Sequence, residues 1–306
     1  MKKKHAAPQW DGRAQGSGWG NWIFFRLIEY FGVYPAYALL VAVSFSYALK
    51  DAASNRALQN YRAHLGKNTT FFHLWRHYYA FGVSLIDRLA ALLCRKLPFT
   101  YSKEGESIIL EALAQGNGII LLGSHIGNWE MAGSLLADVT DAKVNIVMLD
   151  NEREDIEKIF SKATQQRKVA IIAISEEGLD MALPIFSALR RGEIVCMLGD
   201  RVLTQKSTEC TFLGAPASFP AGPYEIAAAS GAPLIPFFVT KHGLKHYHLQ
   251  AQPALISGKL ARATRQHEID AAIKKFVGLM ESVVRKHPCT WLNFYDYWNE
   301  ETIKQS

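Results

Sequence analysis

Two short polar segments each follow an apolar run and contain the residue types that acid–base chemistry needs. One is the segment 123–130 (GSHIGNWE), which contains His125 and Glu130. The other is the segment 199–201 (GDR), which contains Asp200. In open α/β sheets, functional side chains gather at the carboxyl ends of strands, where helix N-termini point their amides. The sequence therefore predicts that these two segments form the functional site.

The spacing of His125 and Glu130 limits how the two side chains can act together. Five residues apart on one continuous helix, they would point about 140° away from each other. They can meet only if His125 lies on a loop and Glu130 in the first helical turn, which the intervening Gly127 and Asn128 allow. Glu130 would then fix the imidazole tautomer and make the other ring nitrogen a better base. The alternative is that Glu130 complements the helix dipole and His125 is a polar loop residue.

Other catalytic and metal-binding patterns are absent from the sequence. A nucleophile elbow needs Gly-x-Ser-x-Gly, and Ser124 has Leu122 where the first glycine should be. No Gly-x-Gly-x-x-Gly dinucleotide loop follows a strand-like run. His73 and His77 share a helix face but lack the glutamate of a metalloprotease helix. We therefore expect neither a metal ion nor a resident cofactor.

Apolar runs alternate with helical patterns through the chain after residue 98. The runs predicted to be strands are 118–123, 144–149, 169–174, 194–199, 234–240 and 246–252. The segments predicted to be helices are 107–115, 129–139, 156–166, 179–191, 221–230 and 269–285. Strands that alternate with helices predict an α/β fold with a largely parallel central sheet flanked by helices.

The beginning of the chain differs in character from the rest. Residues 1–18 are polar, start with MKKK and predict a flexible basic tail. Residues 19–97 have hydrophobic and helical patterns, and the charge-free stretch 30–49 is long enough to span a bilayer. This stretch could cross the membrane, lie in its surface or form a buried core helix. The expected organisation is a tail, an N-terminal hydrophobic helical anchor that associates with a membrane, and a catalytic domain at 98–306.

Composition and charge bound the class of protein. With 49% hydrophobic and 20% charged residues, the 306-residue chain is not disordered, collagen-like or a coiled coil, and it is not a many-span membrane protein. Its net charge of +6 suits anionic partners such as a lipid surface or an acidic carrier protein. The basic residues are not interleaved with stacking aromatics, so nucleic acid is not an expected partner. The four cysteines form no Cys-x-x-Cys pair, which favours a reducing compartment.

Several ordered blocks of the sequence resemble those of a known family. The segment 116–130 (GNGIILLGSHIGNWE) resembles the first motif of the lysophospholipid acyltransferase superfamily. Within that superfamily it is similar to the bacterial lipid A biosynthesis (late) acyltransferases, whose hallmark is a histidine, four intervening residues and an acidic residue. The other similar blocks are 189–201 (LRRGEIVCMLGDR), 211–223 (TFLGAPASFPAGP), 231–236 (GAPLIP) and the aromatic segment 291–298 (WLNFYDYW). The resemblance runs from about residue 20 to residue 300.

The resemblance implies an acyltransferase. Such an enzyme moves an acyl chain from a thioester of acyl carrier protein or coenzyme A to a hydroxyl or amine of a membrane lipid or glycolipid. His125 would be the general base and Glu130 its orienting partner, with direct attack on the thioester and no acyl-enzyme. The enzyme would act at the bacterial inner membrane, on an anionic membrane surface, with its catalytic domain on the cytoplasmic side.

The resemblance also implies which residues bind substrates. The candidates are Asn128, Asp200, Arg201, Phe219, Gly222 and Pro223. Asp200 and Arg201 would hold the acceptor or the donor phosphate, Arg201 through charge-assisted hydrogen bonds. The loop 219–223 would shape the acyl or acceptor pocket. The alternative for this loop is a plain Pro-Gly turn that leads into a helix.

One segment departs from the family pattern and two other functions remain open. Where lipid A enzymes often carry an Arg and a nearby Asn, residues 150–155 read DNERED, so we expect an acceptor other than lipid A, and Arg153 is a weak binding candidate. An acyl thioesterase could use the same base to activate water. A non-catalytic lipid- or carrier-binding protein could have kept the fold.

Overall fold

The computed structural model describes residues 18–93, 98–136, 139–149, 169–174, 182–202 and 206–298. Three predicted segments lie outside the described residues: the basic tail at 1–18, of which only Gly18 is described, the acidic segment at 150–155 and the helix at 156–166.

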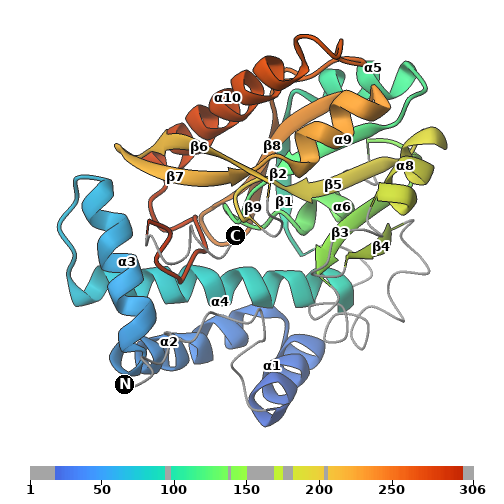
Figure 1. Cartoon of the computed structure of the whole chain (residues 1–306). Coiled ribbons are helices and arrows are strands. Elements are labelled where there is room, and N and C mark those ends of the chain that lie inside the picture. The colour runs from blue at the N-terminus through green and yellow to red at the C-terminus, as the bar shows by residue number, and fades with distance from the viewer. Residues whose placement is uncertain are drawn as a thin grey trace, which may run out of the picture.

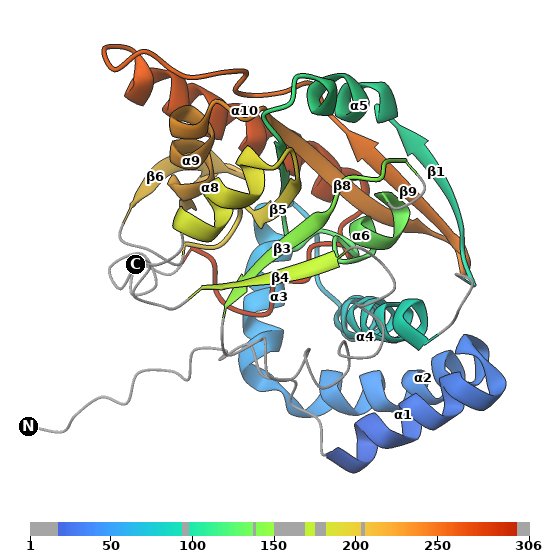
Figure 2. The ribbon, with the colours of Figure 1, turned by 90° about the vertical axis from the view of Figure 1, so that its right-hand side faces the viewer.

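Helices form the described part of the N-terminal region, as the sequence predicts. They are α1 Gly18–Phe31, α2 Val33–Lys50, α3 Ala52–His64 and α4 Phe71–Leu93. α2 packs along α4 (Figure 1), with buried side chains that recur at helical spacing. These side chains are Val33, Ala36, Tyr37, Leu40, Ser44 and Ala48. Since α2 buries one face in this way, α1, α2 and α4 form one helical layer (Figure 2).

The central sheet is largely parallel, which confirms the predicted α/β fold. Among the described residues its strands are β1 Thr100–Glu104, β2 Ile119–Gly123, β3 Val144–Leu149, β4 Val169–Ile174, β5 Ile194–Leu198, β8 Leu234–His242 and β9 His246–Ala251. Their order in the sheet is β1-β9-β8-β2-β5-β3-β4. Neighbouring strands pair in parallel except β8 and β9, which are antiparallel.

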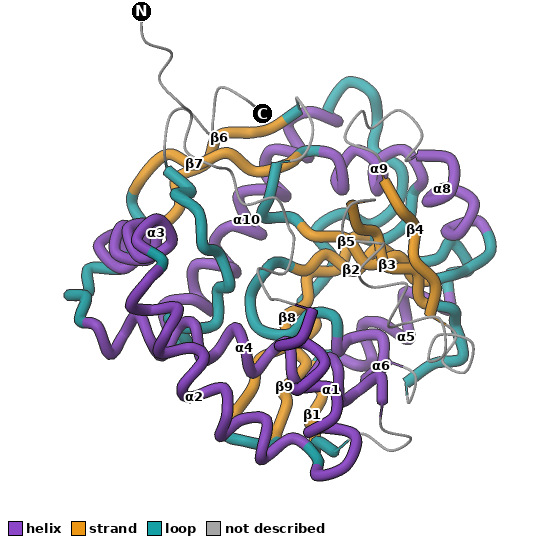
Figure 3. The backbone as a smooth tube through the Cα atoms, turned by 90° about the horizontal axis from the view of Figure 1, so that it is seen from below, coloured by secondary structure: helices purple, strands orange, loops and turns teal. Residues whose placement is uncertain are grey.

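Each face of the sheet is covered by its own hydrophobic core. The remaining described helices are α5 Glu106–Ala114, α6 Met131–Leu136, α8 Ala182–Arg190, α9 Gly222–Ser230 and α10 Arg265–Lys286. Ile120 and Leu122 of β2 face the core shared with α8, α9 and α10. Ile119 and Leu121 face the opposite core, shared with α1, α2 and α4. From below, α1, α2 and α4 cross the face of β1, β8 and β9 (Figure 3), so the N-terminal helices are packed on the sheet.

The end of a hairpin and the start of a helix replace the loop predicted at 219–223. β6 Ser207–Phe212 and β7 Ala215–Pro220 pair antiparallel, and Phe219 therefore lies in a strand. α9 begins at Gly222, with a proline in its first turn, where the missing N–H of Pro223 breaks no helical hydrogen bond. The predicted loop was wrong because its two ends belong to β7 and α9. Contact of Gly222 and the buried Pro223 with substrate stays a prediction.

Candidate active site

The loop after β2 is fixed on two sides by backbone hydrogen bonds. The amide of Gly127 donates to the carbonyl of Thr290 at 2.7 Å, and the amide of Asn128 donates to the carbonyl of Val239 at 3.0 Å. Gly127 has a φ of +69°, and a Cβ there would lie 1.9 Å from the Val239 oxygen. Only glycine fits such an approach. These contacts hold the backbone of His125 at the carboxyl end of β2.

His125 and Asp200 form the central contact of the site. Nδ1 of His125 lies 2.9 Å from Oδ1 of Asp200, and the backbone amide of His125 donates to Oδ2 at 2.9 Å. They meet because β2 and β5 are neighbouring parallel strands, whose carboxyl ends lie at the same edge of the sheet. The His125 side chain is 21% exposed and that of Asp200 only 2%. The imidazole is therefore accessible while the carboxylate behind it is enclosed.

The contacts of Asp200 determine the tautomer of the imidazole. Nε1 of Trp291 donates to Oδ2 of Asp200 at 3.0 Å, and the hydroxyl of Tyr297 donates to its backbone carbonyl at 2.8 Å. Burial alone would raise the pKa of Asp200, but the charge and hydrogen bonds of His125 and the bond from Trp291 hold it below its usual value. An ionised carboxylate only accepts hydrogen bonds, so Nδ1 of His125 carries the proton. In the neutral imidazole the lone pair is then on Nε2, as a general base requires.

Glu130 does not occupy the position beside His125 that its spacing predicts. Both of its carboxylate oxygens accept from Nη1 of Arg88 on α4, at 2.8 and 2.9 Å. The pairing differs from the prediction because Glu130 lies beyond the turn, toward α4, whereas Asp200 directly follows β5, the strand adjacent to β2. Asp200 is thus the carboxylate that orients His125. A requirement for Glu130 in activity stays a prediction.

Asn128 lies inside the protein beneath the loop. The residue is 4% exposed, and its side-chain amide donates to the backbone carbonyl of Ser84 at 3.0 Å. The same amide lies 3.4 Å from the hydroxyl of Tyr247. Its burial and these contacts favour a role in holding the loop against α4 over the predicted contact with substrate.

Two other predicted binding residues contact the C-terminal aromatic segment. The guanidinium of Arg201 lies 5.3 Å from the ring centroid of Tyr295. Phe219 is 0% exposed, and its ring centroid lies 5.8 Å from that of Tyr297. Phe219 thus packs in the core behind Asp200, whereas Arg201 is only half-buried. A role for either in binding substrate stays a prediction.

Three partners within the site did not emerge from the sequence. Trp291 and Tyr297 belong to the aromatic block 291–298. The indole N–H of Trp291 and the hydroxyl of Tyr297 each need an acceptor when buried, and this was the signal that could have linked them to Asp200. Arg88 had no such signal, since it is one of many basic residues in a helical region. Among the described residues, no group of three or more His, Cys, Asp or Glu side chains is arranged to hold a metal ion.

Comparison with known proteins places this chain in a family. The family model described as bacterial lipid A biosynthesis acyltransferase matches residues 82–300, which include His125, Glu130 and Asp200. The chain belongs to this family. The match begins in α4 and ends after the aromatic segment, so it covers the loop and the elements that hold it.

Two curated relatives are similar to part of the chain. The chain is 28% identical, over 192 residues, to a phosphatidylinositol mannoside acyltransferase of Mycobacterium tuberculosis. The aligned region covers 61% of this chain and 56% of the relative. It is 28% identical over 132 residues to a protein of the same name from Mycolicibacterium smegmatis, which covers 41% of each. The chain therefore spans about half the length of the curated relatives it matches.

Proposed function

We propose that this member of the family transfers an acyl chain from a thioester to a hydroxyl or amine of a membrane lipid or glycolipid. The observation that carries the proposal is the contact of His125 Nδ1 with the buried carboxylate of Asp200, which leaves Nε2 as the base. The acceptor class is supported by the family and by relatives named for a glycolipid substrate. The segment 150–155 still favours an acceptor other than lipid A.

The reaction follows from the geometry of the His125–Asp200 pair. Nε2 of His125 takes the proton of the acceptor hydroxyl or amine as its oxygen or nitrogen attacks the thioester carbonyl carbon. The tetrahedral intermediate then breaks its C–S bond, and the departing thiolate takes the proton from Nε2. Asp200 stabilises the imidazolium that forms in between. No covalent acyl-enzyme is needed, because the acceptor itself is the nucleophile.

The remaining site residues support this step. We call the loop after β2, residues 124–130, the catalytic loop. Glu130, held by Arg88, fixes its far end to α4. Arg201 supplies a cation for a phosphate of the donor or the acceptor. Acyl carrier protein and coenzyme A thioesters both carry such a phosphate, and both remain candidate donors. No cofactor beyond the thioester is needed for the step as written.

We also propose that α1 and α2 lie in the membrane surface. α2 has the length and mean hydropathy, 1.3, of a spanning helix, but one third of it is buried in the protein. The exposed large apolar residues of α1 and α2 are Trp22, Ile23, Tyr30, Phe31, Tyr34, Leu39, Val41, Phe45, Tyr47 and Leu49. Aromatic residues of this kind favour the interface of a bilayer.

The packing of α2 argues against a span across the bilayer. Its buried face lies on α4, and α4 carries two charged residues, the fully buried Asp87 and the partly exposed Arg88. A perpendicular α2 would take this charged helix into the hydrocarbon or lose its core contacts, and both are costly. An in-plane α2 keeps those contacts and buries its apolar face in lipid. The proposed place is the cytoplasmic face of a bacterial inner membrane.

The test is acyl transfer into lipid. Labelled acyl carrier protein and acyl-coenzyme A thioesters are incubated with a bacterial lipid extract and the full chain, either wild type or His125→Ala. We expect a labelled lipid with wild type that disappears with the variant, and mass spectrometry then identifies the acceptor. Labelled free fatty acid alone would point to a thioesterase. Equal behaviour of the two proteins would refute His125 as the base and favour a binding protein.

A further inference from the structure

A second buried carboxylate, Asp87, lies near the catalytic loop, to which it is linked through Tyr247 and Asn128. It lies on α4 with a side chain that is 0% exposed, and it pairs with the ammonium of Lys241 on β8. Burial raises the pKa of Asp87 and lowers that of Lys241, while the charge of each opposes the shift of the other. A buried pair of this kind is often no more stabilising than apolar residues of the same size. Stability alone is therefore a weak reason for its presence.

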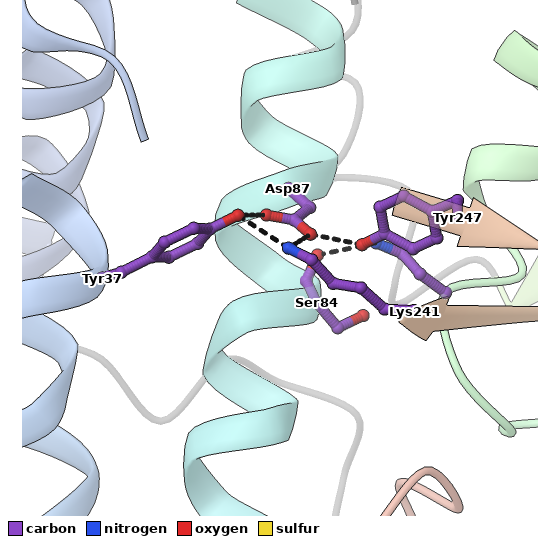
Figure 4. Close-up of polar contacts among 6 residues, drawn as sticks. Tyr37, Ser84, Asp87, Lys241 and Tyr247 are labelled. Atoms are coloured by element: carbon purple, nitrogen blue, oxygen red, sulfur yellow. Dashed lines mark hydrogen bonds and ion pairs between the residues drawn. The ribbon is translucent and has the colours of Figure 1, made fainter. Parts of the chain in front are cut away.

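Two tyrosines from other elements complete this group. Tyr37 of α2 donates to Oδ1 of Asp87, and Tyr247 of β9 donates to Oδ2 (Figure 4). Nζ of Lys241 also donates to the hydroxyl of Tyr37 at 2.7 Å. We call Tyr37, Asp87, Lys241 and Tyr247 the Asp87 cluster. One carboxylate thus ties α2, α4, β8 and β9 together.

Aromatic rings surround the ammonium of this cluster. Nζ of Lys241 lies 4.7 Å from the ring centroid of Tyr37, 5.1 Å from that of Phe99 and 5.4 Å from that of Tyr247. Cation–π attraction offsets part of the lost hydration. The rings also restrict where the ammonium can move. The ammonium of the Asp87 cluster is therefore held by hydrogen bonds and by rings on several sides.

The Asp87 cluster contacts the catalytic loop through Asn128. The side-chain amide of Asn128 lies 3.4 Å from the hydroxyl of Tyr247 and 3.0 Å from the carbonyl of Ser84. Glu130, at the end of the loop, is held by Arg88. Ser84 and Arg88 flank the carboxylate of the cluster within about one turn of α4. One turn of α4 therefore contacts the loop at two points and contacts α2 through the cluster.

We propose that the Asp87 cluster positions the catalytic loop and links its geometry to the packing of α2. The cluster touches neither His125 nor a substrate in this account, so its members are positioning residues. The proposal rests on the proposed transfer reaction, in which the placement of His125 decides the rate. A small displacement of a reacting group is enough to slow such a reaction by up to about 100-fold.

Removal of single hydroxyls tests the two connections of the Asp87 cluster. Tyr247→Phe removes the contact with Asn128 of the loop, and Tyr37→Phe removes the contact between α2 and Asp87. The matched control is Tyr101→Phe, because Tyr101 is the register partner of Tyr247 on β1. We expect Tyr247→Phe to lower kcat by about 10-fold and Tyr37→Phe by a smaller factor, each with an unchanged KM for the thioester. Tyr101→Phe should keep the wild-type kcat.

A readout that does not depend on activity is the low-field proton resonance of His125 Nδ1–H, assigned by its loss in His125→Gln. We expect this resonance to shift in Tyr247→Phe and to stay in place in Tyr101→Phe, at temperatures well below each thermal midpoint. A wild-type kcat and resonance in Tyr247→Phe, despite a lowered midpoint, would overturn the proposal. A normal kcat in Tyr37→Phe alone would overturn the link to α2. If wild type transfers no acyl chain, the proposed function fails, while the resonance still decides the positioning.

Discussion

Among the residues that the structure describes, two buried aspartates, Asp200 and Asp87, each contact a basic side chain, and the two pairs differ in which atoms of the base remain available. In the first pair, Nδ1 of His125 contacts Asp200, and Nε2 remains accessible to a reactant. In the second, the ammonium of Lys241 donates to both Asp87 and Tyr37 and is surrounded by rings. The pKa of Asp200 is lowered and that of Asp87 is raised. A buried pair becomes a candidate catalytic site only where the base retains an accessible atom.

The largest expected effect is on the rate, and it separates the two pairs. His125→Gln removes the base, and we expect kcat for acyl transfer to fall by about 1,000-fold, since a general base contributes on that order. The thermal midpoint should fall only modestly, because the backbone amide of residue 125 and the indole of Trp291 still donate to Asp200. Steady-state kinetics with a labelled thioester measures the loss. If the variant retains more than about a tenth of the wild-type kcat, His125 is not the general base and the two pairs do not differ as described.

The second pair should show its largest effect in stability. Asp87→Ala leaves the ammonium of Lys241 buried without its counter-charge, and we expect a loss of about 3–5 kcal/mol in the free energy of unfolding. Urea denaturation followed by circular dichroism gives this value. The control is the double variant Asp87→Asn with Lys241→Met, which removes both charges and should recover most of the loss. A single variant that loses less than about 1 kcal/mol would show that the pair is not coupled as described.

The opposite pKa shifts predict opposite effects of acid on stability. The folded pKa of Asp200 is lowered, so its contribution to stability is present above its unfolded pKa of about 4 and is lost as the pH falls through the folded value. The folded pKa of Asp87 is raised, so protonation of this group favours the folded state as acid is added. We expect Asp200→Asn to flatten the loss of stability below about pH 4. Unfolding free energies measured from pH 3 to pH 6 check this, and an unchanged slope in the variant would contradict it.

The smallest effect is expected for an exposed pair of the same charge types. Lys206 and Glu225 lie 3.1 Å apart, with side chains 72% and 37% exposed. Lys206→Ala should change the free energy of unfolding by no more than about 0.5 kcal/mol, because solvent screens such pairs. The same urea denaturation measures it. A larger loss would mean that burial is not what distinguishes the pairs.

The sequence predicted the apolar strands well and missed three of the more polar strands. β3 and β4 match their predicted bounds residue for residue, because both are short continuous apolar runs. β1 was missed, since it is an edge strand with the polar sequence TYSKE and alternating exposure. The hairpin of β6 and β7 was missed for a related reason: its polar residues hide the alternation, and Phe219 was assigned to a loop.

The candidate site was predicted in its parts and not in its pairing. The sequence placed His125 and Asp200 at the ends of strands, and the structure places them there. Their contact depends on β2 and β5 being neighbours, which the order of strands along the chain does not reveal. Glu130 was favoured because it is near in sequence, yet its partner Arg88 comes from a helix 42 residues away. Local spacing found the residues, and the topology of the sheet decided their partners.

The central claim is that Asp200, and not Glu130, orients the imidazole of His125. The most direct measurement compares kcat for acyl transfer in Asp200→Asn and Glu130→Gln, in proteins whose thermal midpoints show that both are folded. The account predicts that Asp200→Asn loses about 100-fold or more in kcat, since the amide can hold the wrong tautomer and no longer stabilises the imidazolium. Glu130→Gln should lose clearly less. A near-normal kcat in Asp200→Asn, with a large loss in Glu130→Gln, would contradict it.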